Sequence, residues 1–122
     1  MMKCRGVRGA ITIEHNDREE ILEATKELLK KIVEDNEVDI EDIASIYFSV
    51  TDDLDQEFPA LAARQMGWNH VAMICSNELT TPNCLKKCLR ILMHINTERS
   101  QAEIRHIYLR GAKKLRPDLA AD

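Results

Sequence analysis

The clearest pattern of hydrophobic and polar positions predicts one long helix in the first third of the chain. Between Arg18 and Asp35, apolar residues recur at helical spacing on one face, and Lys and Glu fill the other face. Asp17 can cap the start of this helix, with Glu20 three residues later as in a capping box. Asn36 is a typical stop signal. We therefore expect an amphipathic helix over residues 18–35.

Several shorter segments have the composition of β-strands. Runs of β-branched and apolar residues predict strands over residues 2–13, 43–50, 71–75 and 104–109. Gly6 and Gly9 interrupt the first of these and predict a bulge or a close approach of another segment. A short helix fits Pro59 to Met66, and Gly67 ends it. This order of elements predicts an α/β fold with a mixed sheet in a single domain over residues 1–122.

Two segments after residue 83 are harder to assign. Residues 84–96 carry a helical stripe at Leu85, Cys88, Leu89 and Leu92. They also alternate as a strand would at Ile91, Met93 and Ile95. The pattern alone slightly favours a helix. Further on, we expect residues 112–115 to continue the last strand beyond a bend at Gly111, and Pro117 to end regular structure.

Composition and charge narrow the classes of function. The chain is 44% hydrophobic and 31% charged, as globular proteins are. Its net charge of −4 divides into −9 over residues 1–61 and +5 over residues 62–122. The acidic total argues against nucleic-acid binding, whereas the basic second half could concentrate cations around a small anion. No apolar run approaches a membrane span, and the N-terminal residues do not resemble an export signal, so we expect no membrane partner and a cytoplasmic location.

The residue types that usually carry chemistry do not form a motif of their own. The four cysteines lack the paired spacings of zinc sites, so we expect free thiols packed as small apolar residues and no metal. Arginines in strand-like or apolar settings remain as candidates: Arg8, Arg64, Arg90, Arg105 and Arg116. Arg90 interrupts an apolar run, so its charge must be paired or face a polar cavity. Glu78 is its natural partner. Two interpretations stay open, a plain ion pair and a pocket for a small polycarboxylate.

Five segments together resemble the AroH class of chorismate mutases over almost the full chain. They are Arg5-Gly6-Val7-Arg8-Gly9-Ala10 with Thr12 and Glu14, Phe58-Pro59-Ala60 with Ala63-Arg64 and Gly67-Trp68, Cys84-Leu85-Lys86-Lys87-Cys88-Leu89-Arg90-Ile91-Leu92, His106-Ile107-Tyr108-Leu109-Arg110-Gly111-Ala112, and Leu115-Arg116-Pro117-Asp118-Leu119. The resemblance implies an isomerase of aromatic amino-acid biosynthesis that rearranges chorismate to prephenate and needs no nucleophile, metal or cofactor. It also implies a strand over residues 84–96 and helices on one face of the sheet. The sheets of a homotrimer would form a pseudo-barrel core, with active sites between subunits.

The resemblance also assigns roles to individual residues. Arg90 would face the ether oxygen of the substrate, and Arg8 and Tyr108 would hold its side-chain carboxylate. Glu78 and Cys75 would take the ring hydroxyl. Further substrate contacts would come from Phe58, Ala60, Arg64, Met73, Ile74, Leu115 and Arg116. The chain departs from some relatives at Leu61, at Ile74 and in the loop over residues 81–83, which puts the loop contacts in doubt.

Three other functions remain as alternatives. A non-catalytic trimer that binds a small anion would keep the basic pocket and show binding without turnover. An imine-hydrolysing trimer with arginines between subunits is a second enzymatic alternative, although its motif residues are not apparent. The third alternative is an interaction protein that offers the helix over residues 18–35 to a partner.

Overall fold

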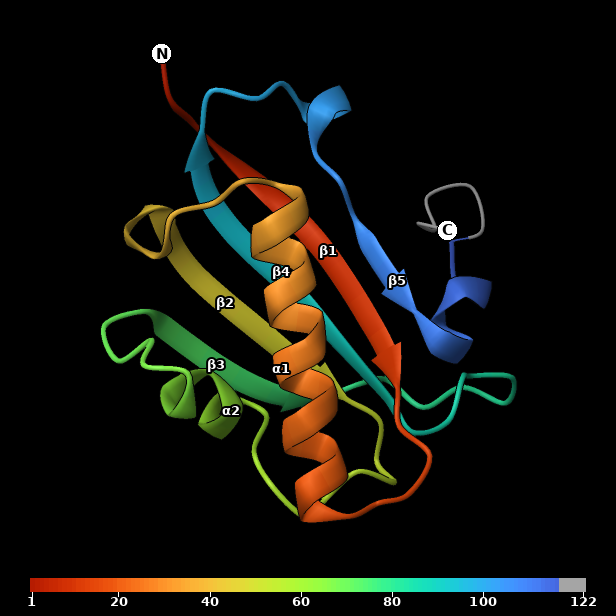
Figure 1. The fold of residues 1–122 in the computed structure, drawn as a ribbon. Coiled ribbons are helices and arrows are strands. Elements are labelled where there is room, and N and C mark those ends of the chain that lie inside the picture. Colours follow the sequence, from red (N-terminus) through yellow and green to blue (C-terminus); the bar gives the residue numbers. More distant parts are fainter. Residues whose placement is uncertain (117–122) are drawn as a thin grey trace.

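One mixed sheet of five strands organises the fold. The computed structural model describes residues 1–116 of the 122-residue chain. The strands are β1 (Lys3–Thr12), β2 (Ile43–Val50), β3 (Ala72–Asn77), β4 (Cys88–Thr97) and β5 (Ile107–Leu109). They lie in the order β3-β2-β4-β1-β5 (Figure 1). β4 runs antiparallel to both β1 and β2, whereas the outer pairs β2–β3 and β1–β5 are parallel. The predicted mixed sheet is confirmed.

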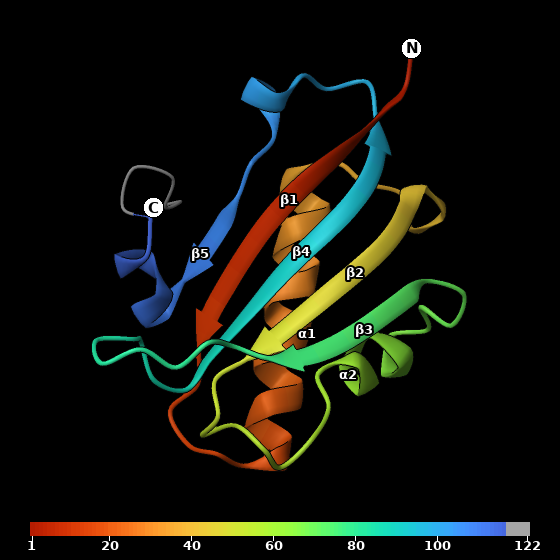
Figure 2. The same cartoon turned by 180° about the vertical axis from the view of Figure 1, so that it is seen from behind.

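Both α-helices lie on the same face of this sheet. They are α1 (Arg18–Asp35) and α2 (Ala60–Gln65). Figure 1 shows them in front of the sheet, and Figure 2 shows the opposite face with no helix over it. Three short 3₁₀ helices complete the elements: η1 (Ile40–Asp42), η2 (Gln101–Glu103) and η3 (Arg110–Lys114). The predicted arrangement, with helices on one face, is confirmed. Within the described residues, none of the helices has the length and apolar character needed to cross a membrane.

Helix α1 has the predicted bounds because its ends carry the expected signals. The Asp17 carboxylate accepts the backbone N–H of Glu20 at 3.1 Å. The reciprocal half of the predicted capping box does not form. Instead, the Glu20 carboxylate accepts the backbone N–H of His15 and lies 2.8 Å from its ring Nδ1. Asn36 ends the helix, and its side chain donates to the Ile32 carbonyl at 2.9 Å.

The core lies between the helices and the sheet face they cover. It contains the apolar stripe of α1 together with alternate residues of the strands, among them Val7, Ile11, Ile46, Phe48, Leu89, Met93, Ile95 and Ile107. Gly9 allows β1 to press against α1, because a Cβ at Gly9 would lie 2.8 Å from Cδ1 of Ile32. The close approach predicted for this glycine is confirmed. Strand β1, which carries Arg8, is therefore seated firmly on the helix.

Four predictions from the sequence pattern need correction. Residues 88–97 form a strand, as the family resemblance implied, because β1 and β2 pair with them on both sides. Residues 112–115 do not extend the last strand, since η3 occupies 110–114. That last strand begins at Ile107 rather than Ile104. Of the cysteines expected in the core, Cys88 is buried but Cys4 is exposed. The expectation for Pro117 lies outside the described residues.

Candidate active site

The uncovered face of the sheet brings several predicted residues into one row. Strand pairing sets Ala10 opposite Arg90 and beside Tyr108, and Arg90 opposite Ser49. Ser49 in turn pairs with Ser76 on β3. Since alternate residues of a strand point to opposite faces, these five side chains share the face opposite the helices. Arg90 therefore lies on the central strand of a polar row.

Arg8, Glu78 and Arg90 surround one hollow on this face. Its volume is about 390 Å³. It is lined by Arg8, Tyr47, Ser49, Ser76, Asn77, Glu78, Leu79, Arg90, Ile91 and Leu92. Arg8 belongs to β1 and Arg90 to β4, and Glu78 directly follows the last residue of β3. The structure thus brings together three of the four residues predicted to carry the chemistry.

The charges around this hollow are only partly neutralised within the chain. Nε of Arg90 lies 3.7 Å from Oε2 of Glu78, and the two side chains are 46% and 24% exposed. Ser49 Oγ donates to the other oxygen of Glu78 at 3.1 Å. Arg8 has no carboxylate partner within residues 1–116. With two guanidinium groups against one carboxylate, the hollow favours an anionic ligand.

A second hollow lies beside β3 and holds the predicted residues Phe58 and Cys75. Its volume is about 400 Å³. The two hollows are adjacent, because Ser76 and Asn77 line both of them. The Phe58 side chain is 68% exposed at the start of α2. Burial raises the pKa of the Cys75 thiol, while the Ala60 backbone N–H and the charge of Arg64 act in the opposite direction. Cys75 is therefore a neutral thiol at pH 7.

Tyr108 and Leu115 occupy a small packed cluster next to Arg90. The cluster contains Ala10, Cys88, Tyr108 and Ala112, with Leu115 packed against it. Tyr108 is only 5% exposed. Burial also raises the pKa of the Cys88 thiol to about 11, although the nearby charge of Arg90 opposes the change. The cluster forms an apolar patch at the β1–β5 end of the row, next to Arg90.

The remaining predicted contacts do not line the first hollow. Met73 and Ala60 belong to the core on the helix side, so their side chains lie on the other face from Arg90. Ile74 is on the open face and 61% exposed. Arg64 acts electrostatically on Glu57 and Cys75 near the second hollow. Arg116 acts on His106, on the β5 side of the sheet.

Seven of the ten residues that line the first hollow were missed by reasoning from the sequence, three hydroxyl-bearing residues among them. Tyr47, Ser49 and Ser76 line it, and the Tyr47 hydroxyl hydrogen-bonds to Ser76 Oγ at 2.5 Å. The signal that could have found Tyr47 and Ser49 is alternation along β2, where residues 47 and 49 point away from the buried residues 46 and 48. Their alignment with Arg90, however, depends on the pairing of β2 with β4. Residues 1–116 contain no group of three or more His, Cys, Asp or Glu side chains arranged to hold a metal ion.

Comparisons with known proteins identify the family of this chain. The family model for chorismate mutase type I matches residues 4–119. A chorismate mutase AroH of Bacillus subtilis is 45% identical over 98% of this chain and 94% of its own length. One from Thermus thermophilus is 46% identical over 94% and 95% of the two chains. A solved chorismate mutase from Clostridium thermocellum superposes with a TM-score of 0.89 at 47% identity, covering 90% of this chain and 98% of that one. The chain therefore belongs to the chorismate mutase type I family.

Proposed function

We propose that this chain catalyses the concerted rearrangement of chorismate to prephenate, with Arg90 as the cation that stabilises the transition state. The observation that carries the proposal is the Arg90 guanidinium, which lies in a hollow with Arg8 and Glu78 and is only partly neutralised by Glu78. Membership of the chorismate mutase type I family supports the reaction. Chorismate is a dianion, which suits a hollow with two guanidinium groups.

The reaction is accelerated when the negative charge that develops on one atom is stabilised. The C–O bond of the enolpyruvyl ether breaks while a new C–C bond forms, so negative charge grows on the ether oxygen. A fixed cation placed against that oxygen binds the transition state more strongly than the substrate, and this difference raises kcat. Arg90 suits this role because it lies on the central strand, whose backbone is paired on both sides. No bond to the protein forms at any point.

The other residues of the site hold the substrate in its reactive conformation. Arg8 binds the side-chain carboxylate, and the Tyr108 hydroxyl assists it from the β5 side. Glu78, oriented by Ser49, accepts the ring hydroxyl, with Cys75 nearby. Phe58 and Leu115 contact the ring, and Arg64 and Arg116 attract the dianion to the opening. Holding both ends of a flexible substrate in a compact conformer can lower the barrier by several kcal/mol, up to about 7–11 kcal/mol in well-oriented intramolecular reactions.

The same proposal includes a homotrimer whose active sites lie between subunits. The open sheet face exposes Tyr47, Ile74 and Leu92, by 42%, 61% and 39%. Such an uncovered apolar strip favours contact with another chain. Arg90 is 46% exposed in the single chain, and a neighbouring subunit would exclude water from it and strengthen its field. Sedimentation at micromolar concentration should give the mass of three chains; a monomer that turns over chorismate contradicts the shared site.

A direct assay separates catalysis from simple anion binding. Loss of chorismate absorbance should be faster with the protein than without it, in proportion to protein concentration. Calorimetry with prephenate serves as the companion measurement. Saturable binding without acceleration would identify the non-catalytic anion-binding trimer and reject the mutase. A cytoplasmic location belongs to the proposal as well, and the free thiols of all four cysteines suit a reducing compartment.

A further inference from the structure

The backbone of Arg8 is held by a histidine side chain at a point where the neighbouring strand has not yet begun. The Arg8 N–H donates to Nδ1 of His106 at 2.9 Å. Pairing of β1 with β5 starts one residue later, where Gly9 lies opposite Ile107. The imidazole therefore takes the place of a strand carbonyl as the acceptor for Arg8. This contact lies on the side of Arg8 away from the first hollow.

The contact requires a neutral ring. Nδ1 can accept a hydrogen bond only when its lone pair is free, so the ring proton is on Nε2. Burial is the first cause that lowers the pKa of His106, and the charges of Arg8 and Arg116 lower it further. The charged groups around the ring thus come from β1 and from the segment after η3. A hollow of about 310 Å³ beside it is otherwise lined by uncharged Gly6, Leu92, Gln101 and Ile104.

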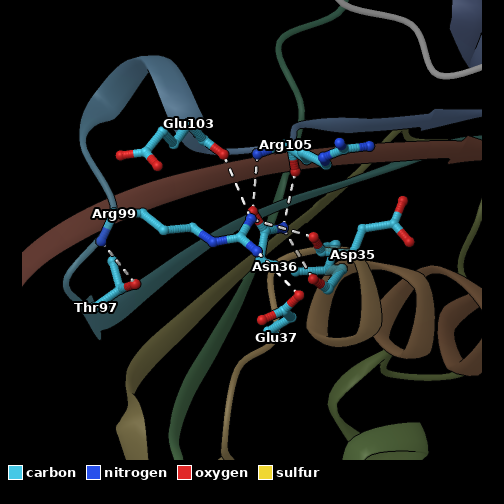
Figure 3. Close-up of polar contacts among 8 residues, drawn as sticks. Asp35, Asn36, Glu37, Thr97, Arg99, Glu103 and Arg105 are labelled. Carbon is cyan, nitrogen blue, oxygen red and sulfur yellow. Dashed lines mark hydrogen bonds and ion pairs between the residues drawn. The ribbon is translucent and has the colours of Figure 1, made fainter.

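A buried asparagine fixes the residue that precedes this histidine. Asn36, at the end of α1, is only 2% exposed. Its Oδ1 accepts the Arg105 N–H at 2.8 Å, and its Nδ2 donates to the Arg105 carbonyl at 2.9 Å (Figure 3). Arg99 reinforces the same corner by donating to the carbonyls of Asp35 and Glu103. The backbone on the N-terminal side of His106 is therefore attached to the rigid end of α1.

From these contacts we propose that His106 is a positioning residue, which in its neutral form holds the Arg8 backbone so that the Arg8 guanidinium meets the substrate carboxylate. This inference rests on the proposed function, because it needs the role given there to Arg8. Protonation of His106 would set Nδ1–H against the Arg8 N–H, so the hydrogen bond would be lost and a second positive charge would face Arg8. Substrate binding should then weaken as the pH falls, although the ring gains a charge attractive to an anion.

Two substitutions at His106 separate positioning from general stability. His106→Asn keeps an acceptor oxygen close to the Nδ1 position and cannot be protonated, whereas His106→Leu removes the acceptor. At pH 8, His106→Leu should raise KM about three- to tenfold, the value of one net hydrogen bond, and change kcat little. His106→Asn should rescue KM. His70→Leu is the matched control, because His70 is an exposed histidine on a different part of the surface.

The pH profile of KM supplies a readout that a merely structural role would not move, and one amide resonance reports on the hydrogen bond itself. KM of the unmodified protein should rise on acidification, at a pH below the ordinary imidazole pKa of about 6.5 because burial lowers the pKa of His106, and KM of His106→Asn should not. The Arg8 amide resonance should shift over the same pH range in the unmodified protein only. A KM that is unaffected by His106→Leu, or that falls on acidification, overturns the positioning role. The protein could lack mutase activity while its Arg8 amide resonance still shifts with pH. That result would reject the proposed function and the expected effect on substrate binding, but it would still support the hydrogen bond between Arg8 and His106.

Discussion

Glu78 and Arg90 meet across the end of β2, with Oε2 of the carboxylate 3.7 Å from Nε of the guanidinium. Ser49, the last residue but one of β2, lies in register with Arg90 and donates to Oε1 of Glu78. The pair is half-open to solvent, so its attraction contributes less than about 1 kcal/mol to folding. The arrangement is weak as a structural ion pair and well placed as part of a binding site, which makes the two interpretations separable by experiment.

Replacing Arg90 should therefore affect the reaction far more than stability. The Arg90→Met variant, or citrulline introduced at this position by semisynthesis, should lower kcat by about 10² to 10³ or more, since one preorganised donor already accounts for that range. Arg90→Lys should rescue poorly, because an ammonium group lacks the planar fork. Chorismate absorbance gives kcat, and urea unfolding of the same samples should shift little. A loss of stability with kcat of the folded fraction retained would mark Arg90 as structural.

Removal of the Ser49 hydroxyl should weaken substrate binding without unfolding the protein. Ser49→Ala leaves Glu78 with one hydrogen bond fewer, so we expect KM to rise about two- to tenfold while kcat changes less. Ser45→Ala is the matched control, because Ser45 lies on the same strand and hydrogen-bonds to His94 instead. Steady-state kinetics of the two variants at one pH make the comparison. Equal effects of both substitutions would contradict a specific role for Ser49.

The glycines of β1 should differ sharply in their tolerance of a methyl group. A Cβ at Gly9 would lie 2.8 Å from Cδ1 of Ile32 and 3.2 Å from Cδ1 of Leu28, both buried in the core. Gly9→Ala should destabilise the protein by about 1–2 kcal/mol net, because overpacking outweighs the gain from a stiffer unfolded chain. At Gly6 the nearest atom would be 3.4 Å away, so Gly6→Ala should be nearly neutral. Urea midpoints of the two variants test the difference.

The buried thiol of Cys88 should make stability fall in alkaline solution. Its pKa is raised from 9.0 to about 11, chiefly by burial. The thiol is neutral in both states below pH 9, so its contribution is fully present there. Between pH 9 and 11 the unfolded chain loses this proton first, which favours unfolding. The free energy of unfolding should therefore decline more steeply for the unmodified protein than for Cys88→Ala across that range.

Other groups also titrate in alkali, so the comparison needs a control. Cys4→Ala removes an exposed thiol and should leave the alkaline slope unchanged. Parallel slopes for the unmodified protein and Cys88→Ala would contradict the raised pKa.

Local signals were sufficient for some elements and insufficient for others. The bounds of α1 could be predicted because its cap, its apolar stripe and its stop all lie within the helix and its flanking residues. Residues 88–97 satisfy two periodicities, and only their pairing with β1 and β2 makes them a strand. The segment 110–114 turns into η3 directly after β5, where Arg110 has a positive φ of 55°. Interactions across the sheet, which a single segment does not encode, decided the first case, and in the second Arg110 and Gly111 hydrogen-bond to Thr12 at the end of β1.

The candidate site shows the same division. The Arg90–Glu78 pair could be predicted because a charge within an apolar run needs a partner. The packing of Met73 and Ala60 on the helix side could not be predicted from the sequence, since the face to which each side chain points depends on the sheet register and on the packing of α2. The contacts of Ser49 and His106 could not be predicted either. Each is an ordinary polar residue until strand pairing brings it to Glu78 or to Arg8.

The strand order also has a consequence for synthesis on the ribosome. β4 lies between β1 and β2 in the sheet but follows both in the chain. The pairing of β4 with β1 and β2 therefore cannot form until residues 88–97 leave the exit tunnel, and any part of β1 or β2 that is formed earlier has an open hydrogen-bonding edge. Pairing of strands that are far apart in the sequence slows folding, and unpaired strand edges can contact other chains before the pairing is complete. Arg90 arrives with the strand that joins β1 to β2, so the nascent protein acquires the proposed catalytic cation together with the centre of its sheet, and β5 follows.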